Sequence, residues 1–196
     1  MKQFIPIFLF LLLSIASYSQ NEAAQAIMAR REKVNADFQN SKSSPLEAAD
    51  LKKFAGLNYF PIDPAYRVQA KFVKTERPSI FKMKMTASPK MEYTTVGYVT
   101  FEFHGIEYKL IAYKKPEGDD AYFIPFTDAT NGKETYESGR YIEFPVPTGD
   151  QIILDFNGAY NPYCAYSRRF SCPIPPPENH LGVAISAGEK KFKQSH

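Results

Sequence analysis

The chain has 196 residues, with 24 Lys and Arg against 21 Asp and Glu, so its formal net charge at pH 7 is only +3. This balance argues against a nucleic-acid-binding surface, which requires a clustered basic face. The length suits one domain that is large enough to bury its own core.

Residues 1–19 are typical of a secretory signal peptide. Lys2 gives a positive start, an apolar run extends from Phe4 to Ala16, and small residues precede a cut expected between Ser19 and Gln20. The apolar run is shorter than the roughly 20 residues that span a bilayer. No second long apolar stretch follows. The sequence therefore predicts an exported protein, periplasmic or secreted, without a membrane span.

Residues 20–56 predict an N-terminal helical segment with two helices. From Gln20 to Ser41, the larger apolar residues recur at steps of three and four, which indicates an amphipathic helix. A second helix is expected to follow Ser44, which is a suitable N-cap, with Glu47 completing a capping box. Gly56 is expected to end this helix.

Residues 57–196 have the composition of a β-rich domain. Turn-forming residues separate seven segments rich in β-branched and aromatic residues: 66–74, 80–85, 95–113, 122–126, 141–144, 151–156 and 182–186. In the clearest hairpin, His104 and Gly105 connect two alternating arms as a two-residue primed turn. The pattern predicts a mainly β (α+β) fold, an antiparallel β-sandwich or partly open barrel with two N-terminal helices.

The segment after residue 157 is constrained by prolines and holds several polar residues. Asp155 and Asn157, on the strand before it, alternate onto one face and point toward this proline-rich segment (residues 158–179). The segment's own polar candidates are Tyr160, Asn161, Glu178 and Asn179. Two alternatives stay open, since these side chains could bind a ligand or could only satisfy the backbone of the loop.

Arg140 is the candidate for binding an anionic group, because its planar guanidinium matches a carboxylate or phosphate. Its structural alternative is an internal salt bridge to Glu134, Asp155 or Glu178. The same three carboxylates are the candidate acid and base of a hydrolase, although their spacing in sequence does not give their separation in the fold. We expect Arg140, Asp155, Asn157 and the Glu178-Asn179 pair to converge.

Cys164 and Cys172 are the only cysteines, and export predicts a disulfide between them. A zinc site that includes His180 is disfavoured, because thiols outside the cytoplasm oxidise readily. No phosphate-binding loop, nucleophile elbow, His-Glu-x-x-His or Cys-x-x-Cys motif is present. The sequence therefore predicts no cofactor and no metal.

Motifs in the second half of the chain carry a family resemblance. They are Gly-Lys-Glu-Thr-Tyr with Gly-Arg-Tyr, Asp-Phe-Asn-x-Ala-Tyr-Asn-Pro-x-Cys-Ala-Tyr, Cys-Pro-x-Pro-Pro-x-Glu-Asn, and Val-Ala-Ile-x-Ala-Gly-Glu-Lys. On these motifs the chain resembles a bacterial and archaeal family of unknown function (DUF1684). The resemblance implies no activity, cofactor or partner. It implies that the following residues fall on motif positions: Glu134, Arg140, Asp155, Asn157, Asn161, Cys164, Cys172, Glu178 and Asn179.

Three functional hypotheses follow. The favoured one is a β-domain that binds a small ligand, with an anionic ligand suited to a polar site at Arg140, Asp155 and Glu178. The second is a hydrolase that uses Glu134, Asp155 or Glu178 as acid and base. The third is a structural module whose polar motif only holds its own loop.

Overall fold

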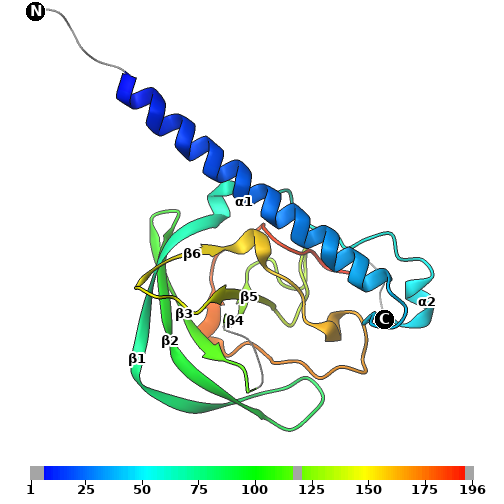
Figure 1. The fold of residues 1–196 in the computed structure, drawn as a ribbon. Helices are drawn as coiled ribbons and strands as arrows, with labels where there is room; N and C mark the ends of the chain where they lie inside the picture. Colours follow the sequence, from blue (N-terminus) through cyan, green and yellow to red (C-terminus); the bar gives the residue numbers. More distant parts are fainter. Residues whose placement is uncertain (1–6, 117–120, 193–196) are drawn as a thin grey trace, which may run out of the picture.

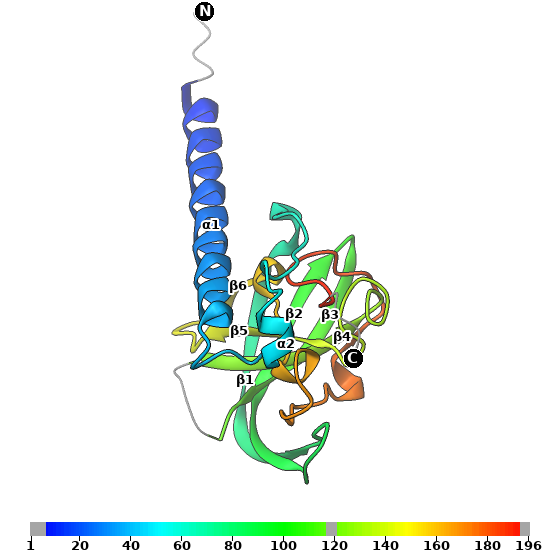
Figure 2. The same cartoon turned by 90° about the vertical axis from the view of Figure 1, so that its right-hand side faces the viewer.

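A long helix passes alongside a curled β-sheet in the computed structural model, which describes residues 7–116 and 121–192 (Figures 1 and 2). This helix, α1, covers Ile7–Gln39, and its first turns project beyond the β-rich body. The expected leader starts in residues 1–6, which lie outside the described residues, and residues 7–19 form the beginning of α1. Within the described part of the chain, no helix is long and apolar enough to cross a membrane.

The second expected helix is reduced to a single turn, α2 (Ala48–Leu51). Ser44 does not cap it, because its hydroxyl accepts a hydrogen bond from the Leu46 N–H (3.2 Å) in a turn of its own. Glu47 occupies the N-cap position, and its carboxylate accepts a hydrogen bond from the distant Ser167 hydroxyl. The expected capping box is therefore wrong, since a tertiary contact takes the side chain that would have closed it.

The sheet has seven strands: β1 (Arg67–Met83), β2 (Met91–Phe103), β3 (Ile106–Lys114), β4 (Ala121–Asp128), β5 (Arg140–Pro145), β6 (Gln151–Asp155) and β7 (His180–Leu181). Six of them pair antiparallel in the order β5-β4-β3-β2-β1-β6, and the short β7 pairs parallel with β4. The mainly β fold is thus confirmed. The sheet curls on itself as a half-barrel, so the sandwich alternative is wrong (Figure 1).

Irregular pairing allows the long strands to bend. The β1–β2 register shifts between Lys74 and Ser79, and the β2–β3 register shifts between Thr95 and Gly97. Such irregularities increase the local twist and bend a strand. Two expected strands, 66–74 and 80–85, are consequently parts of one continuous β1.

The predicted hairpin between β2 and β3 is confirmed. His104 and Gly105 have φ angles of 52° and 74°, as a primed turn requires, and Phe103 pairs with Ile106. The strand expected at 182–186 does not form. Its Ile185 N–H instead donates a hydrogen bond to the Asp128 carboxylate (3.2 Å).

Buried side chains form three groups. The main core lies inside the curled sheet and includes Val99, Leu110, Ile124, Leu154 and Phe156. A helix cluster of Phe38, Leu46, Leu57, Ala165 and Tyr166 attaches α1 to the body. An aromatic cluster comprises Met83, Tyr93, Tyr113, Phe123 and Tyr141.

Phe38→Ala should lower the free energy of unfolding by about 3–5 kcal/mol, the range for a buried aromatic residue truncated to alanine. Phe38 is 4% exposed and packs edge-on against Tyr166 (4.8 Å between ring centroids). Urea unfolding measures the loss. The control is Met28→Ala on the same helix, where a 53% exposed side chain should cost less than about 0.5 kcal/mol. Equal small losses in both variants would show that α1 is not docked through Phe38.

Candidate functional site

Arg140 is a buried structural residue with every contact made to the protein itself. Its side chain is fully buried, and its guanidinium donates to the Asp128 carboxylate (2.8 Å). It also donates to the main-chain carbonyls of Ile185 (2.8 Å), Ala187 and Glu189 (3.2 Å). The internal salt bridge is thus present, but its partner is Asp128, not Glu134, Asp155 or Glu178.

Asp155 and Asn157 hold the end of β6 in place. The Asp155 carboxylate lies 3.6 Å from Arg67 and accepts a hydrogen bond from the Asn157 N–H (3.0 Å). The Asn157 side chain accepts from the Asp63 N–H (3.0 Å) and donates to the Asp63 carbonyl (2.9 Å). Both residues therefore fix local backbone.

Asn179 bonds to a different part of the fold. Asn179 is fully buried and its side chain bonds to the main chain of Ile111 and Pro125. Glu134 and Glu178 are exposed. The predicted convergence is wrong, because Arg140, Asp155 and Asn179 bond to partners in different parts of the fold, and Glu178 is exposed. The proposed carboxylate set of a hydrolase is not brought together.

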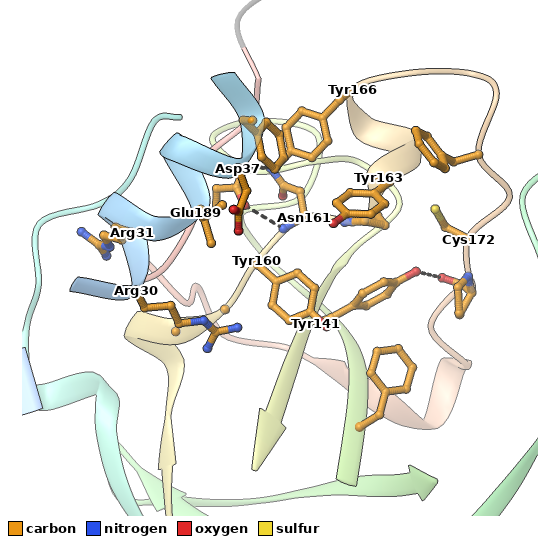
Figure 3. Close-up of a pocket in the computed structure, with 18 of the residues that line it drawn as sticks. Arg30, Arg31, Asp37, Tyr141, Tyr160, Asn161, Tyr163, Tyr166, Cys172 and Glu189 are labelled. Carbon is orange, nitrogen blue, oxygen red and sulfur yellow. Dashed lines mark hydrogen bonds between the residues drawn. The ribbon is translucent and has the colours of Figure 1, made fainter. Parts of the chain in front are cut away.

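A different site is present between α1 and the proline-rich segment (Figure 3). It is a cavity of about 450 Å³, and three predicted ligand-binding residues line it: Asn157, Tyr160 and Asn161. Aromatic residues form a large part of the remaining wall, which comes mainly from α1, the aromatic cluster and the proline-rich segment. Its rings include Tyr93, Phe123, Tyr141, Tyr160, Tyr163, Tyr166 and Phe170.

Hydrogen bonds hold two tyrosine rings in fixed positions in this wall. The Tyr141 hydroxyl donates to the Pro173 carbonyl, and the Tyr160 hydroxyl donates to the Glu143 carboxylate (2.8 Å). The two rings meet edge-on, with 5.7 Å between their centroids. Burial raises the pKa of both hydroxyls, so they remain protonated donors. The rings are therefore held rigidly around the space that Figure 3 shows.

Glu189 forms the polar end of the cavity, near α1. It is buried and accepts hydrogen bonds from the Tyr166 hydroxyl, the Asn161 N–H (3.0 Å) and the Asn161 Nδ2 (3.0 Å). Burial raises the pKa of Glu189 to about 7, against these three bonds and the Arg140 charge, which lower it. The carboxyl group therefore changes its charge near neutral pH.

Glu189 reaches the cavity because its backbone lies close to that of Ala159. Gly188 has a φ of +76°, and a Cβ at this position would lie 2.6 Å from the Ala159 carbonyl oxygen. The Glu189 N–H donates to that same carbonyl (2.9 Å). Glycine is therefore required at position 188 to bring the carboxylate against the proline-rich segment.

Asn161 leaves an acceptor open beside this carboxylate. Its Nδ2 donates to Glu189 Oε1 (3.0 Å) and to the Lys190 carbonyl (2.9 Å), which fixes the orientation of the amide. Its Oδ1 is buried and has no hydrogen-bond partner among the described residues. Leaving a buried polar atom unpaired costs about 1–3 kcal/mol. Asn161 thus lines the cavity and has a buried, unpaired amide oxygen.

Basic residues line the cavity on the α1 side and at the rim. The Arg31 guanidinium donates to the main-chain carbonyls of Phe60 (3.1 Å) and Asn157 (3.4 Å), and Lys115 pairs with Glu143. Arg30 is exposed, and its guanidinium lies over the Tyr160 ring, 5.5 Å from the centroid. Of these cations, Arg30 is the one placed to meet an incoming anion.

The sequence did not single out Glu189 or Arg30. Glu189 follows the glycine of the Ala-Gly-Glu-Lys motif. That glycine was the available signal, because a glycine can mark a close approach of two backbone segments. Arg30 lies on a helix that was expected, but helical periodicity does not show which loop the helix will cover.

Cys164 and Cys172 are present as two thiols, and the Cys164 N–H donates to Cys172 Sγ (3.1 Å). The disulfide between them stays a prediction. Among the described residues, no group of three or more His, Cys, Asp or Glu side chains is arranged to hold a metal ion.

Comparisons with known proteins support the family and add no activity. A family profile described as "Protein of unknown function (DUF1684)" matches residues 52–190. The chain is 35% identical to an uncharacterised protein from gene locus rrnAC0354 of Haloarcula marismortui, solved by solution NMR. The similarity covers 88% of this chain and 96% of that one, with a TM-score of 0.71. No curated protein matches. The matched range includes Asn161 and Glu189 but not the cavity residues of α1.

Arg140→Ala should cost about 3–5 kcal/mol of folding free energy, because it leaves the buried Asp128 carboxylate without its cation. Arg67→Ala is the matched control, since its pair with Asp155 is partly exposed and should contribute less than about 1 kcal/mol. Denaturant unfolding of the two variants measures the difference. A small loss in Arg140→Ala would contradict the structural role.

The raised pKa of Glu189 should make stability fall as pH rises. The folded state holds the Glu189 proton more tightly than the unfolded state, whose carboxyl has a pKa near 4.5. Stability should therefore decline between about pH 4.5 and pH 7, by about 3 kcal/mol in total from this group. Glu189→Gln should lack this decline. Unfolding curves at several pH values measure both proteins, and parallel pH profiles would refute the assignment.

Proposed function

This chain belongs to the DUF1684 family of proteins of unknown function, and we propose that it binds a small molecule in the cavity between α1 and the proline-rich segment. The cavity of aromatic rings that hydrogen bonds hold in place is the observation that carries the proposal, and the buried, unpaired Oδ1 of Asn161 adds an acceptor in its wall. The volume of about 450 Å³ also lies within the roughly 300–1,000 Å³ usual for ligand pockets.

The lining favours a ligand of particular chemistry. Rigid aromatic walls suit a ring or another flat apolar body. Asn161 Oδ1 suits an N–H or O–H group on that body. Arg30, at the rim, suits an anionic substituent. A small cyclic acid that also carries a hydroxyl or amide donor combines these features.

The proposal differs from the two alternatives in the residues that it uses. None of the carboxylates considered for a hydrolase, Glu134, Asp155 or Glu178, lines this cavity. A purely structural module accounts for the contacts of Arg140 and Asn179, but not for an aromatic cavity with an open acceptor. Export of the mature chain, to the periplasm or the medium, remains part of the proposal and rests on the leader-like residues 1–19.

The test measures binding of hydroxybenzoic acids and other small cyclic acids. Each acid is compared with its primary amide, which has the same ring but no negative charge. Binding should raise the melting temperature, since a ligand at 100 times its Kd stabilises by about 2.7 kcal/mol. Arg30→Ala should weaken the acids about fivefold, for the loss of roughly 1 kcal/mol of charge interaction, and should leave the amides unaffected. Thermal unfolding and calorimetric titration give the two readouts.

Adjacent positions on α1 supply a matched control. Ile27 lines the cavity, so Ile27→Trp should fill it and abolish the stabilisation by acids and amides alike. Met28 is 53% exposed and does not line the cavity, so Met28→Trp should leave the stabilisation intact. If no compound stabilises the protein, or if Ile27→Trp binds as well as the unmodified chain, the cavity is not the binding site.

A further inference from the structure

The two cysteines lie in the wall between two separate hollows of the surface. Cys172 lines the aromatic cavity, opposite α1 in Figure 3. Cys164 lines a second groove of about 940 Å³, on the other side of the proline-rich segment. Cys164 is half-buried, whereas Cys172 is 6% exposed. One thiol of the pair is therefore accessible and the other is protected.

Several contacts hold the sulfur atoms together. The Cys164 N–H donates to Cys172 Sγ (3.1 Å). The Tyr136 hydroxyl donates to Cys164 Sγ (3.7 Å) from the groove side. Two hydrogen bonds join the Cys172 backbone to Thr86 in the β1–β2 connection. The Cys172 N–H donates to Thr86 Oγ1 (2.9 Å), and the Thr86 N–H donates to the Cys172 carbonyl (3.0 Å). These contacts hold the two cysteines side by side.

The same contacts make the two thiols unequal. The hydrogen bond from Cys172 lowers the pKa of Cys164 to about 7, assisted by Tyr136 and opposed by partial burial. The hydrogen bond to Cys164 and burial raise the pKa of Cys172. The accessible Cys164 therefore loses its proton at a lower pH than the buried Cys172 does.

We propose that Cys164 and Cys172 form a redox-active dithiol, in which Cys164 attacks a disulfide bound in the second groove and Cys172 resolves the product. This site is independent of the aromatic cavity's proposed ligand. It also goes beyond a structural disulfide, because the bond is expected to form and break in exchange reactions.

Each step is a thiol–disulfide exchange. The Cys164 thiolate attacks one sulfur of the disulfide, forms a mixed disulfide with it and expels the other half as a thiolate. Cys172 then loses its proton and attacks Cys164 Sγ, which closes the Cys164–Cys172 bond and releases the second half. In total, the two protein thiols lose two electrons and the bound disulfide gains them. The two protons leave with the two thiols that are released.

The groove favours an anionic disulfide. Its lining contains four basic residues, Lys133, Arg168, Lys190 and Lys191, and two acidic residues, Glu134 and Glu137. An excess of positive charge around the nucleophile raises the local concentration of an anion and stabilises the departing thiolate. A small peptide disulfide with free carboxylates, such as oxidised glutathione, has this chemistry.

Trapping with oxidised glutathione at pH 7 tests the order of the steps. Cys172→Ser should accumulate one glutathionyl group on Cys164, because no resolving thiol is present. Cys164→Ser should remain unmodified on the same timescale. The unmodified chain should lose two hydrogens without keeping an adduct, and reduced glutathione should reverse this change. Intact-mass spectrometry follows all three proteins, and circular dichroism confirms that each is folded.

The rate of reaction provides a readout that a structural disulfide would not change. At pH 7 a thiol with a pKa of about 7 is roughly 50-fold more ionised than one at 9, and lower nucleophilicity removes about tenfold of that gain. Cys164 of the reduced, unmodified chain should therefore react with oxidised glutathione roughly fivefold faster than an ordinary thiol. It should react faster with oxidised glutathione than with cationic cystamine, and added salt should narrow the difference.

Several results would overturn the proposal. Equal adduct formation in Cys172→Ser and Cys164→Ser would remove the assigned order of attack. An internal disulfide that reduced glutathione cannot open would identify a purely structural bond. Equal rates with both charged disulfides would reject an anionic substrate. None of these results depends on a ligand in the aromatic cavity, so the two proposals fail separately.

Discussion

The buried ion pair between Arg140 and Asp128 positions the parts of the chain that build the cavity. Desolvating two charges costs several kcal/mol per ion, and their attraction compensates only when further hydrogen bonds complete the geometry. Here the guanidinium also binds the carbonyls of Ile185, Ala187 and Glu189. The other Asp128 oxygen accepts hydrogen bonds from Thr130 and Ile185. The C-terminal segment therefore lies against β4 and β5 without forming a strand.

The position of this segment determines the chemistry of the cavity. Because Arg140 holds its carbonyl, Glu189 turns its side chain inward, where Asn161 and Tyr166 donate to it. Burial then raises the pKa of this carboxyl group to about 7. Arg140 and Asp128 thus mainly hold the fold together. They position an aromatic cavity whose wall contains the Glu189 carboxyl group and the unpaired Asn161 Oδ1. Helix α1 completes the wall from outside the matched family range.

Local signals predicted the local parts of this structure well. The primed turn at His104 and Gly105 and the alternating arms of β2 and β3 depend on neighbouring residues, so the sequence pattern was sufficient. The second helix was shortened because Glu47, its expected capping residue, binds Ser167, which lies 120 residues away. Two expected strands merged into β1 because a bulge bends a strand without ending it.

The site was harder to predict, because it depends on long-range pairing. Asp128 became the partner of Arg140 through the β4–β5 register, in which Phe126 pairs with Arg140. Nothing in the spacing distinguished Asp128 from the other carboxylates. Tyr160 and Asn161 were predicted as site residues from their rigid setting, and both line the cavity. Glu189 was missed because a lone acidic residue near a chain end usually faces solvent.

The central claim is that Arg140 builds the site and the aromatic cavity binds the ligand. An NMR titration of isotope-labelled protein with the most stabilising compound of the panel tests it most directly. The account predicts that chemical-shift changes concentrate on the Asn161 side-chain amide and on the rings of Tyr160 and Tyr166. The Arg140 Nε–H signal should remain nearly unchanged. Large changes at Arg140 and Glu178, with none at Asn161, would contradict the account and restore the polar cluster as the binding site.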